Sequence, residues 1–493
     1  MRARHAISLL ALPLLLAACG GEDAPARQRY LADVLVQADE PLIRSRPQHV
    51  AGKFAEMGRR LYAYYRGTVP VFIRDWQNQT LLEFDSRFHV DSVLPLSIGD
   101  AHPENFGILV ASDGTLALEP NDFDSADRYP YLWDVRRLVT GLALAARLAR
   151  PDGDPDATAR RDRDIARRAA VAYVDRLRDL AAGGPRDALT SPGANPILVD
   201  LFSRAQEQWD AREELIELTE LDGNQRRLRR GVLAFDEPEN VYQDLPPFAL
   251  DALPATLETY RQTLIDPPDA DFFRVLDAAR ELGSGVASWP RIRVIILVRG
   301  PSDAPEDDVL LEMKELTDSP VRGWIPPGVY YDDVGQRVRE TARALWARPD
   351  AEPLWGTTHW LGIPMQIKHE AEGLKTVRTK RMEGDRGGVD ALLGLADALG
   401  STLARLHAAP LPDEGNPAAV LVATIDLDPD GFADEQADFA VAYADQVEAD
   451  WAHLRQALAD YGPTLGLVPD AADRPATDFA AVLGRPEPVL PIE

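Results

Sequence analysis

Cysteine is almost absent from this chain of 493 residues, which contains only Cys19. A single thiol cannot form an internal disulfide or a multi-cysteine zinc site. Histidine is also scarce, with eight residues, and none of them falls in a His-Glu-x-x-His pattern. The sequence lacks a Gly-x-Ser-x-Gly elbow as well. Zinc hydrolases and serine hydrolases are therefore poorly supported.

Basic residues are in deficit, because 53 Lys and Arg face 80 Asp and Glu and leave a net charge of −27. A charge of this size repels nucleic acid and anionic lipid head groups at long range. No nucleic-acid partner is expected. A content of 45% hydrophobic and 27% charged residues is typical of a folded globular protein.

Long apolar runs are missing except at the N-terminus, where Arg2 and Arg4 precede the stretch Ala6 to Ala18. That stretch is shorter than the roughly 20 residues of a membrane-spanning helix, and it reads as a signal peptide over 1–18. The ending Leu-Ala-Ala-Cys resembles a bacterial lipobox, which implies that Cys19 carries lipid. We expect a protein of the bacterial cell envelope, anchored in a membrane and facing the periplasm, with 19–45 as anchor and tether. An ordinary signal with a chance cysteine is the alternative.

Apolar periodicity predicts an α+β fold dominated by helices. One group of strands is expected near residue 100 and a second group after residue 290. Three structural segments follow from this pattern: a helical lobe with a small hairpin over 46–280, an antiparallel-sheet lobe over 281–385, and helices that complete the helical lobe over 386–493. The helices are expected at 50–66, 132–148, 157–182, 195–221, 332–346, 389–407 and 432–461, and the strands at 94–98, 107–111, 115–118, 292–298, 309–316, 364–369 and 375–382.

The most informative stretch is Gly-Asp-Ala-His-Pro-Glu-Asn-Phe-Gly over 99–107, followed by Asn-Asp-Phe-Asp over 121–124. Phosphoryl transfer needs a carboxylate near the attacking hydroxyl and oxygen ligands that hold Mg²⁺ against the phosphates. In kinases, an Asp and an Asn five residues apart on one loop supply two of these groups, and an Asp on the next hairpin completes the site. Asp100 and Asn105 have this separation, and Asp122 and Asp124 end the hairpin that follows. Solvated turns are the structural alternative.

A nucleotide site would also need a glycine-rich cover and a lysine for the phosphates. Gly283, Gly285 and Ser288 precede the strand that is expected from residue 292. Glycines let the backbone approach phosphate oxygens closely. Lys314 lies among apolar residues of the next strand, and a buried lysine needs an anionic partner. Glu340 on the following helix is the predicted partner.

The pattern Gly-Asp-x-His-x-x-Asn, then Asp-Phe-Asp, then Trp-Asp, resembles the loop of aminoglycoside phosphotransferases and choline kinases. Together with Tyr-Arg-Gly at 65–67 and Trp-Asp-Val-Arg-Arg-Leu at 133–138, it resembles more closely the uncharacterised bacterial family called domain of unknown function 2252. The likeness is densest over 57–147 and returns in patches between 282 and 407. It implies a protein-kinase-like two-lobed fold with Asp100 as catalytic carboxylate and Asn105 and Asp122 as metal ligands. The supporting residues would be His102, Asp134, which would cap the loop backbone, and Arg66, for which a structural ion pair is equally plausible.

The order of these parts is reversed relative to kinases, because the candidate catalytic loop precedes the lysine. A circular permutation explains this order and predicts that His407, at the end of the helix that usually leads into the catalytic loop, lies near Ile98. The expected function is a transferase that uses Mg²⁺ (or Mn²⁺) and moves a phosphoryl or nucleotidyl group from ATP or another nucleotide to an unknown acceptor. Envelope spaces are expected to lack ATP, so a non-catalytic binding protein is the alternative, and a phosphohydrolase is a third reading. The basic run 226–230 is expected on a solvated helix face.

Overall fold

The structure is a computed structural model of the chain, and it describes residues 24–78, 85–111, 113–233, 240–320, 333–348, 350, 352–370, 373–411 and 415–467. The predicted signal peptide, Cys19 and the segment from residue 468 lie outside the described residues. No helix of the described part is both long and apolar enough to cross a membrane.

Helices make up most of the described chain, and strands alternate with them only in the first and middle parts. The helices are α1 (Ala24–Ser45), α2 (Pro47–Arg59), α3 (Leu61–Gly67), α4 (Val69–Asn78), α5 (Tyr131–Ala149), α6 (Pro155–Ala181), α7 (Pro196–Ala211), α8 (Glu213–Leu218), α9 (Pro247–Arg261), α10 (Val334–Leu345), α11 (Val389–His407), α12 (Pro417–Ile425) and α13 (Pro429–Tyr461). Several begin at an Asp or Asn whose side chain accepts a backbone N–H of the first turn, as Asp154, Asn195, Asp333, Asn416 and Asp428 do.

The strands form antiparallel sheets, which the predicted α+β class requires. The largest has seven strands in the order β12-β13-β11-β10-β9-β8-β7, and a smaller one has the order β14-β2-β3. The strands are β1 (Leu96–Ser97), β2 (Phe106–Val110), β3 (Leu116–Pro120), β4 (Asp127–Arg128), β5 (Thr219–Asp222), β6 (Gln225–Leu228), β7 (Gly231–Leu233), β8 (Asn240–Asp244), β9 (Val275–Leu282), β10 (Arg293–Val298), β11 (Val309–Glu315), β12 (Gly356–Trp360), β13 (Ile363–His369) and β14 (Lys375–Thr376).

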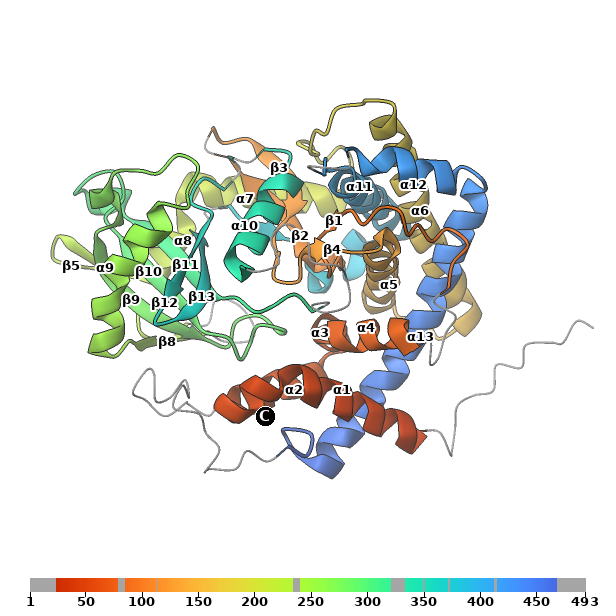
Figure 1. Cartoon of the computed structure of the whole chain (residues 1–493), viewed down its shortest axis with the longest axis horizontal. Helices are drawn as coiled ribbons and strands as arrows, with labels where there is room; N and C mark the ends of the chain where they lie inside the picture. Colours follow the sequence, from red (N-terminus) through yellow and green to blue (C-terminus); the bar gives the residue numbers. More distant parts are fainter. Residues whose placement is uncertain are drawn as a thin grey trace, which may run out of the picture.

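Figure 1 shows two lobes, with the seven-stranded sheet on the left and most of the helices on the right. One face of this sheet is apolar and packs against α9 through Leu253, Leu257 and Tyr260, which are all almost fully buried. The sheet lobe extends beyond the expected interval 281–385, because β7, β8 and α9 precede residue 281 and β9 begins before it. Strand β9 was not expected, because its Ala278 and Ala279 interrupt the apolar alternation on which strand prediction depends.

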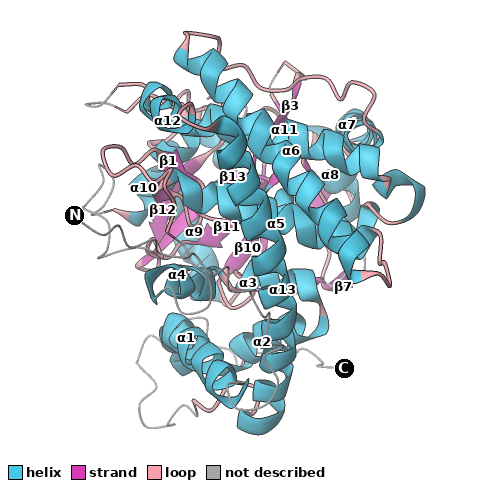
Figure 2. Cartoon of the chain, turned by 90° about the vertical axis from the view of Figure 1, so that its right-hand side faces the viewer, coloured by secondary structure: helices cyan, strands magenta, loops and turns pink. Residues whose placement is uncertain are grey.

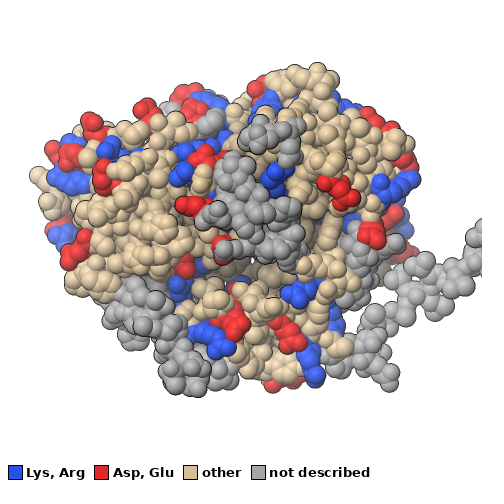
Figure 3. Space-filling model, viewed as in Figure 1, with Lys and Arg blue, Asp and Glu red and all other residues tan. Residues whose placement is uncertain are grey.

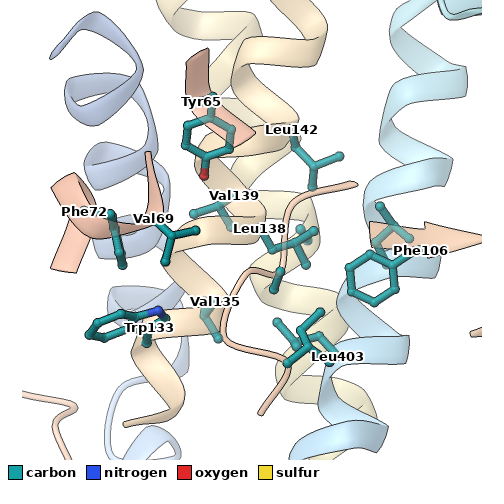
Figure 4. Close-up of a cluster of buried hydrophobic side chains, with 14 of the residues drawn as sticks. Tyr65, Val69, Phe72, Phe106, Trp133, Val135, Leu138, Val139, Leu142 and Leu403 are labelled. Carbon is teal, nitrogen blue, oxygen red and sulfur yellow. The ribbon is translucent and has the colours of Figure 1, made fainter. Parts of the chain in front are cut away.

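The helical lobe is assembled from both ends of the chain. Helices α5 and α6 pack against α11 and α13, which come more than 200 residues later (Figure 2). In its core, Phe72 of α4 lies edge-on to Trp133 of α5, with ring centroids 5.4 Å apart. Figure 4 shows Leu403 of α11 and Phe106 of β2 in the same apolar cluster. This core is continuous with the loop that carries the candidate catalytic residues.

Residues 24–45 form helix α1 rather than the tether expected over 19–45. Leu31, Leu35 and Ile43 are fully buried in the main core. Arg27 is held between two carboxylates, with its Nη1 2.7 Å from Asp75 and its Nη2 2.5 Å from Asp450 of α13. The tether prediction is therefore wrong for the described part of this segment, because buried apolar and ion-paired residues fix it to the lobe.

Three further expectations need correction. The predicted helix 195–221 is divided into α7 and α8 by Arg212, whose backbone is left-handed, and it ends in strand β5. The basic run 226–230 begins in strand β6 instead of lying on a helix. The predicted strand 375–382 is reduced to β14, which pairs with β2 of the helical lobe and not with the large sheet. Acidic and basic side chains are interspersed over the face in Figure 3, without one large basic patch.

Candidate active site

The loop from Ile98 to Asn105 is fixed to helix α5 by a buried carboxylate. Asp134 accepts the backbone N–H of Ile98 and of Gly99, both at 3.0 Å. Gly99 has φ +76°, and a Cβ at this position would lie 2.3 Å from the carbonyl oxygen of Ser125. Only glycine combines this backbone conformation with so close an approach. The contact that the family resemblance implies for Asp134 is present.

His407 ends α11 beside this loop, although it is more than 300 residues away in sequence. Its Nε2 lies 3.4 Å from Oδ2 of Asp134, the same oxygen that accepts the N–H of Ile98. Its Nδ1 lies 2.9 Å from the hydroxyl of Tyr173, and the side chain is fully buried. The prediction that His407 lies near Ile98 is confirmed, and the burial of His407 agrees with a structural role.

Asp100 of this loop is held by one arginine of α5, Arg137. Both contacts involve the same carboxylate oxygen, Oδ1, which accepts from Nε of Arg137 at 3.0 Å and from its Nη2 at 2.5 Å. Burial raises the pKa of Asp100 to about 6, and the Arg137 guanidinium opposes that shift. The other oxygen, Oδ2, is 3.6 Å from Nε2 of His102. A carboxylate with this pKa is ionised at neutral pH and can still accept a proton, as a general base must.

The predicted supporting residues surround Asp100. His102 is 2% exposed, and burial together with Arg66 and Arg137 keeps its pKa well below the usual range, so the ring is neutral. Arg66 forms an ion pair with Glu104 of the loop, with Nη1 2.9 Å from Oε2. The other oxygen of Glu104 accepts the backbone N–H of Thr379 at 2.8 Å. Arg66 therefore fixes the loop through Glu104 and does not contact Asp100 directly.

Asn105 joins the loop to the hairpin that follows. Its Nδ2 donates to the carbonyl oxygen of Asp100 at 2.9 Å, and its own carbonyl oxygen accepts the N–H of Asn121 at 3.1 Å. The hydrogen bond from Nδ2 orients the side-chain amide of Asn105 and leaves its Oδ1 as an acceptor. The two predicted metal ligands, Asn105 and Asp122, are thereby brought onto adjacent backbone segments.

Asp122 and Asp124 have different surroundings at the end of the hairpin. The Asp122 side chain is 39% exposed, whereas that of Asp124 is 11% exposed. Oδ2 of Asp124 is 2.6 Å from both Nζ of Lys314 and Nη1 of Arg291. Although burial acts to raise it, the pKa of Asp124 is lowered because Lys314 and Arg291 favour the ionised form. Asp122 is the accessible carboxylate, and Asp124 neutralises two cations.

Lys314 belongs to β11, and its Nζ also lies 3.7 Å from Oδ1 of Asp122. The predicted ion pair between Lys314 and Glu340 is wrong. Glu340 of α10 is paired with Arg339 at 2.7 Å and with Arg343 at 3.5 Å. Lys314 is 6% exposed and points toward the hairpin, so Asp124 supplies the carboxylate that burial requires.

The glycine-rich segment joins β9 to β10 beside this network. Gly283 and Gly285 both have positive φ, and Ser288 Oγ lies 3.4 Å from Nη2 of Arg293. Val286 and Trp289 are buried, and Trp289 packs so closely on α2 that a Cβ at Gly52 would lie 2.7 Å from its Nε1. The end of this segment leads directly to Arg291, which reaches Asp124. The turn is thus connected to the hairpin through one arginine.

Within the described residues, no group of three or more His, Cys, Asp or Glu side chains is arranged to hold a metal ion. The candidate metal ligands Asn105 and Asp122 fit a different arrangement. Mg²⁺ is commonly bound by one or two carboxylates together with substrate phosphates, and it keeps several waters. Oδ1 of Asp124 is buried and makes no hydrogen bond in the described structure, so a further acceptor oxygen is left two residues after Asp122.

Sequence reasoning missed three arginines that organise the site. Arg137 binds Asp100, Arg291 binds Asp124, and Arg337 of α10 donates to the carbonyl oxygens of Ala126 and Thr317. Arg137 could have been recognised, because it lies in the mainly apolar helix predicted over 132–148 and a buried guanidinium needs a partner. Arg291 and Arg337 carry no comparable sequence signal.

Comparison with known proteins gives one significant result. The profile of a family described as an uncharacterised protein conserved in bacteria, DUF2252, matches residues 44–457. No curated protein and no solved structure is significantly similar to the chain. The matched range contains the loop, the hairpin, the glycine-rich segment and Lys314.

Proposed function

The chain belongs to the DUF2252 family of uncharacterised bacterial proteins, and we propose that it is a kinase-like transferase that uses a divalent cation and moves a phosphoryl or nucleotidyl group from a nucleotide to an acceptor. The observation that carries this proposal is the position of Lys314. Its Nζ lies 2.6 Å from Asp124 and 3.7 Å from Asp122, on the hairpin directly after the Asp100 loop. A phosphate-binding lysine, a metal-binding carboxylate and a base are the parts that phosphoryl transfer uses.

The arrangement of the sheet lobe supports the same reading. The glycine-rich turn joins β9 to β10, Lys314 lies on the next strand, β11, and helix α10 follows. Protein kinases use a glycine-rich loop over the phosphates and a lysine on the third strand. The contact of His407 with the Ile98 loop agrees with a circularly permuted version of that fold. We therefore propose a kinase-like architecture whose parts occur in a different chain order.

In the proposed reaction each residue has one task. Oδ2 of Asp100 accepts the proton of the acceptor hydroxyl, while Arg137 holds Oδ1 and fixes the direction of the carboxylate. Lys314 and Arg291 turn from Asp124 toward the phosphates and offset their charge. Asn105 and Asp122 would hold Mg²⁺ or Mn²⁺, which when bound neutralises charge on the phosphate oxygens.

A non-catalytic binding protein is the second candidate, and one observation favours it. The two cations nearest the hairpin already bind Asp124, which is 11% exposed. A ligand must compete with this buried ion pair before Lys314 can contact phosphate. Under this reading the same residues bind a ligand without turnover. We also propose, from the N-terminal sequence alone, that either form is anchored in the cell envelope through lipid on Cys19.

Thermal unfolding of the purified protein with a nucleotide panel and Mg²⁺ or Mn²⁺ tests the proposal. A ligand at 100 times its dissociation constant adds about 2.7 kcal/mol to stability, so the unfolding midpoint should rise. The rise should require the divalent cation and disappear in Asp122→Asn. Asp113→Asn, at the other end of the same hairpin and paired with Arg348 on the surface, is the matched control and should keep it. A midpoint that no nucleotide shifts would remove the nucleotide site.

Turnover separates the two candidates. Transfer of phosphate to an acceptor, abolished by Asp100→Asn while nucleotide binding is kept, supports the transferase. Binding without transfer to any acceptor supports the binding protein. Release of phosphate with water as the only acceptor would identify a hydrolase.

A further inference from the structure

A row of polar side chains crosses the large sheet at the level of Lys314. Successive cross-strand partners in this row are Tyr242 of β8, Glu281 of β9, Arg293 of β10, Lys314 of β11 and Gln366 of β13. Directly opposite residues of neighbouring strands project from the same face of a sheet. This face is the one from which Lys314 reaches Asp122 and Asp124.

The neighbouring positions of this face are also charged, and ion pairs connect them. Nη1 of Arg293 lies 2.5 Å from Glu312, and its Nε lies 3.6 Å from Glu281. Nζ of Lys368 lies 3.6 Å from the other oxygen of Glu312. The side chains of Glu281, Glu312 and Lys368 are between 5% and 14% exposed. Beside Lys314 the sheet is therefore a buried charged surface.

The apolar part of the same face is already covered. Ile295, Leu297 and Leu310 lie further along the strands and pack against Leu215 and Leu218 of α8 and against Leu228 of β6. The opposite face of the sheet is filled by α9. No described apolar area of the sheet is left next to Lys314.

This surface is unsuited to an aromatic base. A nucleobase buried in a protein is normally held between apolar or aromatic walls. Glu312, Arg293 and Lys368 are already buried and paired with one another, so a base stacked on them would offer these charges no new partners. The groups suited to a donor are instead the cations at the hairpin, Lys314 and Arg291, whose buried Nε makes no hydrogen bond in the described structure.

We infer that the donor is recognised through its polyphosphate chain and its divalent cation, without a pocket for the base, so that inorganic polyphosphate serves as donor as well as a nucleoside triphosphate does. This inference rests on the proposed transferase function and specifies its donor. With tripolyphosphate, the acceptor oxygen forms a bond to the terminal phosphorus, and the bond from that phosphorus to the bridging oxygen breaks. Pyrophosphate leaves with the electron pair, and the acceptor proton passes to Asp100.

Titration calorimetry of the full chain with Mg²⁺ tests the inference, with tripolyphosphate, ATP, GTP and CTP as probes. The four dissociation constants should agree within tenfold, and adenosine should not compete with ATP. A nucleotide that binds more than tenfold tighter than tripolyphosphate, or competition by adenosine, would overturn the inference while leaving the proposed function intact. Binding of none of the four probes would remove the proposed function and the inference together.

Two variants give an independent readout. Arg291→Gln should weaken the binding of tripolyphosphate and of ATP by the same factor, because both ligands would contact this residue only through phosphate. Arg299→Gln is the matched control, because Arg299 follows the far end of β10 and pairs with Asp303 on the surface. It should leave both affinities unchanged. If Arg291→Gln lowered the affinity for ATP but not the affinity for tripolyphosphate, recognition through phosphate alone would be contradicted.

Discussion

Arg137 donates from two of its nitrogens to a single oxygen of Asp100, at 3.0 Å from Nε and 2.5 Å from Nη2. The other oxygen of Asp100, Oδ2, accepts from neither of these nitrogens and lies 3.6 Å from Nε2 of His102. The arginine thus holds the carboxylate in one orientation without occupying the atom that would accept a proton. This pair links helix α5 to the loop, so stability should depend on it, and the proposed chemistry would depend on it as well.

Breaking this pair from the arginine side should be costly. Arg137→Gln leaves Asp100 buried without its cation, and such a change lowers the free energy of unfolding by about 3 kcal/mol or more. The double variant Asp100→Asn with Arg137→Gln should lose less than the sum of the single losses, because neither charge is then left alone. Urea denaturation of the wild type, the two single variants and the double variant measures the coupling free energy between the two side chains. Additive losses would show that the two side chains do not interact.

The loop should also depend on Asp134. Asp134→Ala leaves the buried amides of Ile98 and Gly99 without an acceptor, at about 1–3 kcal/mol each. Asp134→Asn keeps one acceptor oxygen and should lose roughly half as much. The denaturation midpoints of the two variants give this order. Equal stability of Asp134→Ala and the wild type would contradict the capping role.

Glu340 and Lys314 should behave differently when they are replaced. Glu340→Gln removes pairs with Arg339 and Arg343 that are partly exposed, and we expect less than about 0.5 kcal/mol. Lys314→Gln leaves the buried Asp124 with Arg291 alone and should cost about 3 kcal/mol. Thermal or chemical unfolding distinguishes them. A large and similar loss of stability in both variants would instead support the ion pair between Lys314 and Glu340 that the sequence predicted.

Glu352 provides a test by pH. Burial raises the pKa of Glu352 to about 7, while Lys368 opposes that shift. In the unfolded chain the group ionises near its ordinary value of 4.5, so the folded state binds more protons between these values. The contribution of Glu352 to the stability of the fold is therefore largest below pH 4.5 and is lost as the pH rises through about 7.

The matched variant is Glu352→Gln, which can still accept the N–H of His369. Relative to this variant, the wild type should lose on the order of 2 kcal/mol between pH 4.5 and 7.5. Urea denaturation at several pH values measures the difference. A constant difference across this range would show that Glu352 ionises normally in the folded protein.

Most helices could be predicted from the sequence because their apolar spacing is regular. The predicted helix 389–407 coincides with α11, and that over 132–148 differs from α5 by one residue at each end. The loop and hairpin were found because Gly, Asp and Asn at fixed spacing are a local signal. Their mutual contacts follow from short sequence separation, as between Asn105 and Asn121.

Contacts between distant segments could not be predicted in the same way. Lys314 needed a buried carboxylate, but the sequence could not show whether it came from the next helix or from a hairpin 190 residues earlier. The strand β9 was missed because Ala278 and Ala279 interrupt its apolar alternation, while its burial is set by the neighbouring strands β8 and β10. Helix α1 was read as a tether because its fixation depends on Asp75 and Asp450, which are remote in sequence.

The order of the parts along the chain also has a consequence for how the protein is made. The loop with Asp100 is synthesised early, but its supports include His407 of α11, and its lobe is completed by α13, which ends at Tyr461. Closing contacts over such a span delays folding, because the entropy of the intervening chain must be lost first. During synthesis the contacts of the loop with Asp134 and Arg137 are available early, whereas the support from His407 is added only when almost the whole polypeptide has been made.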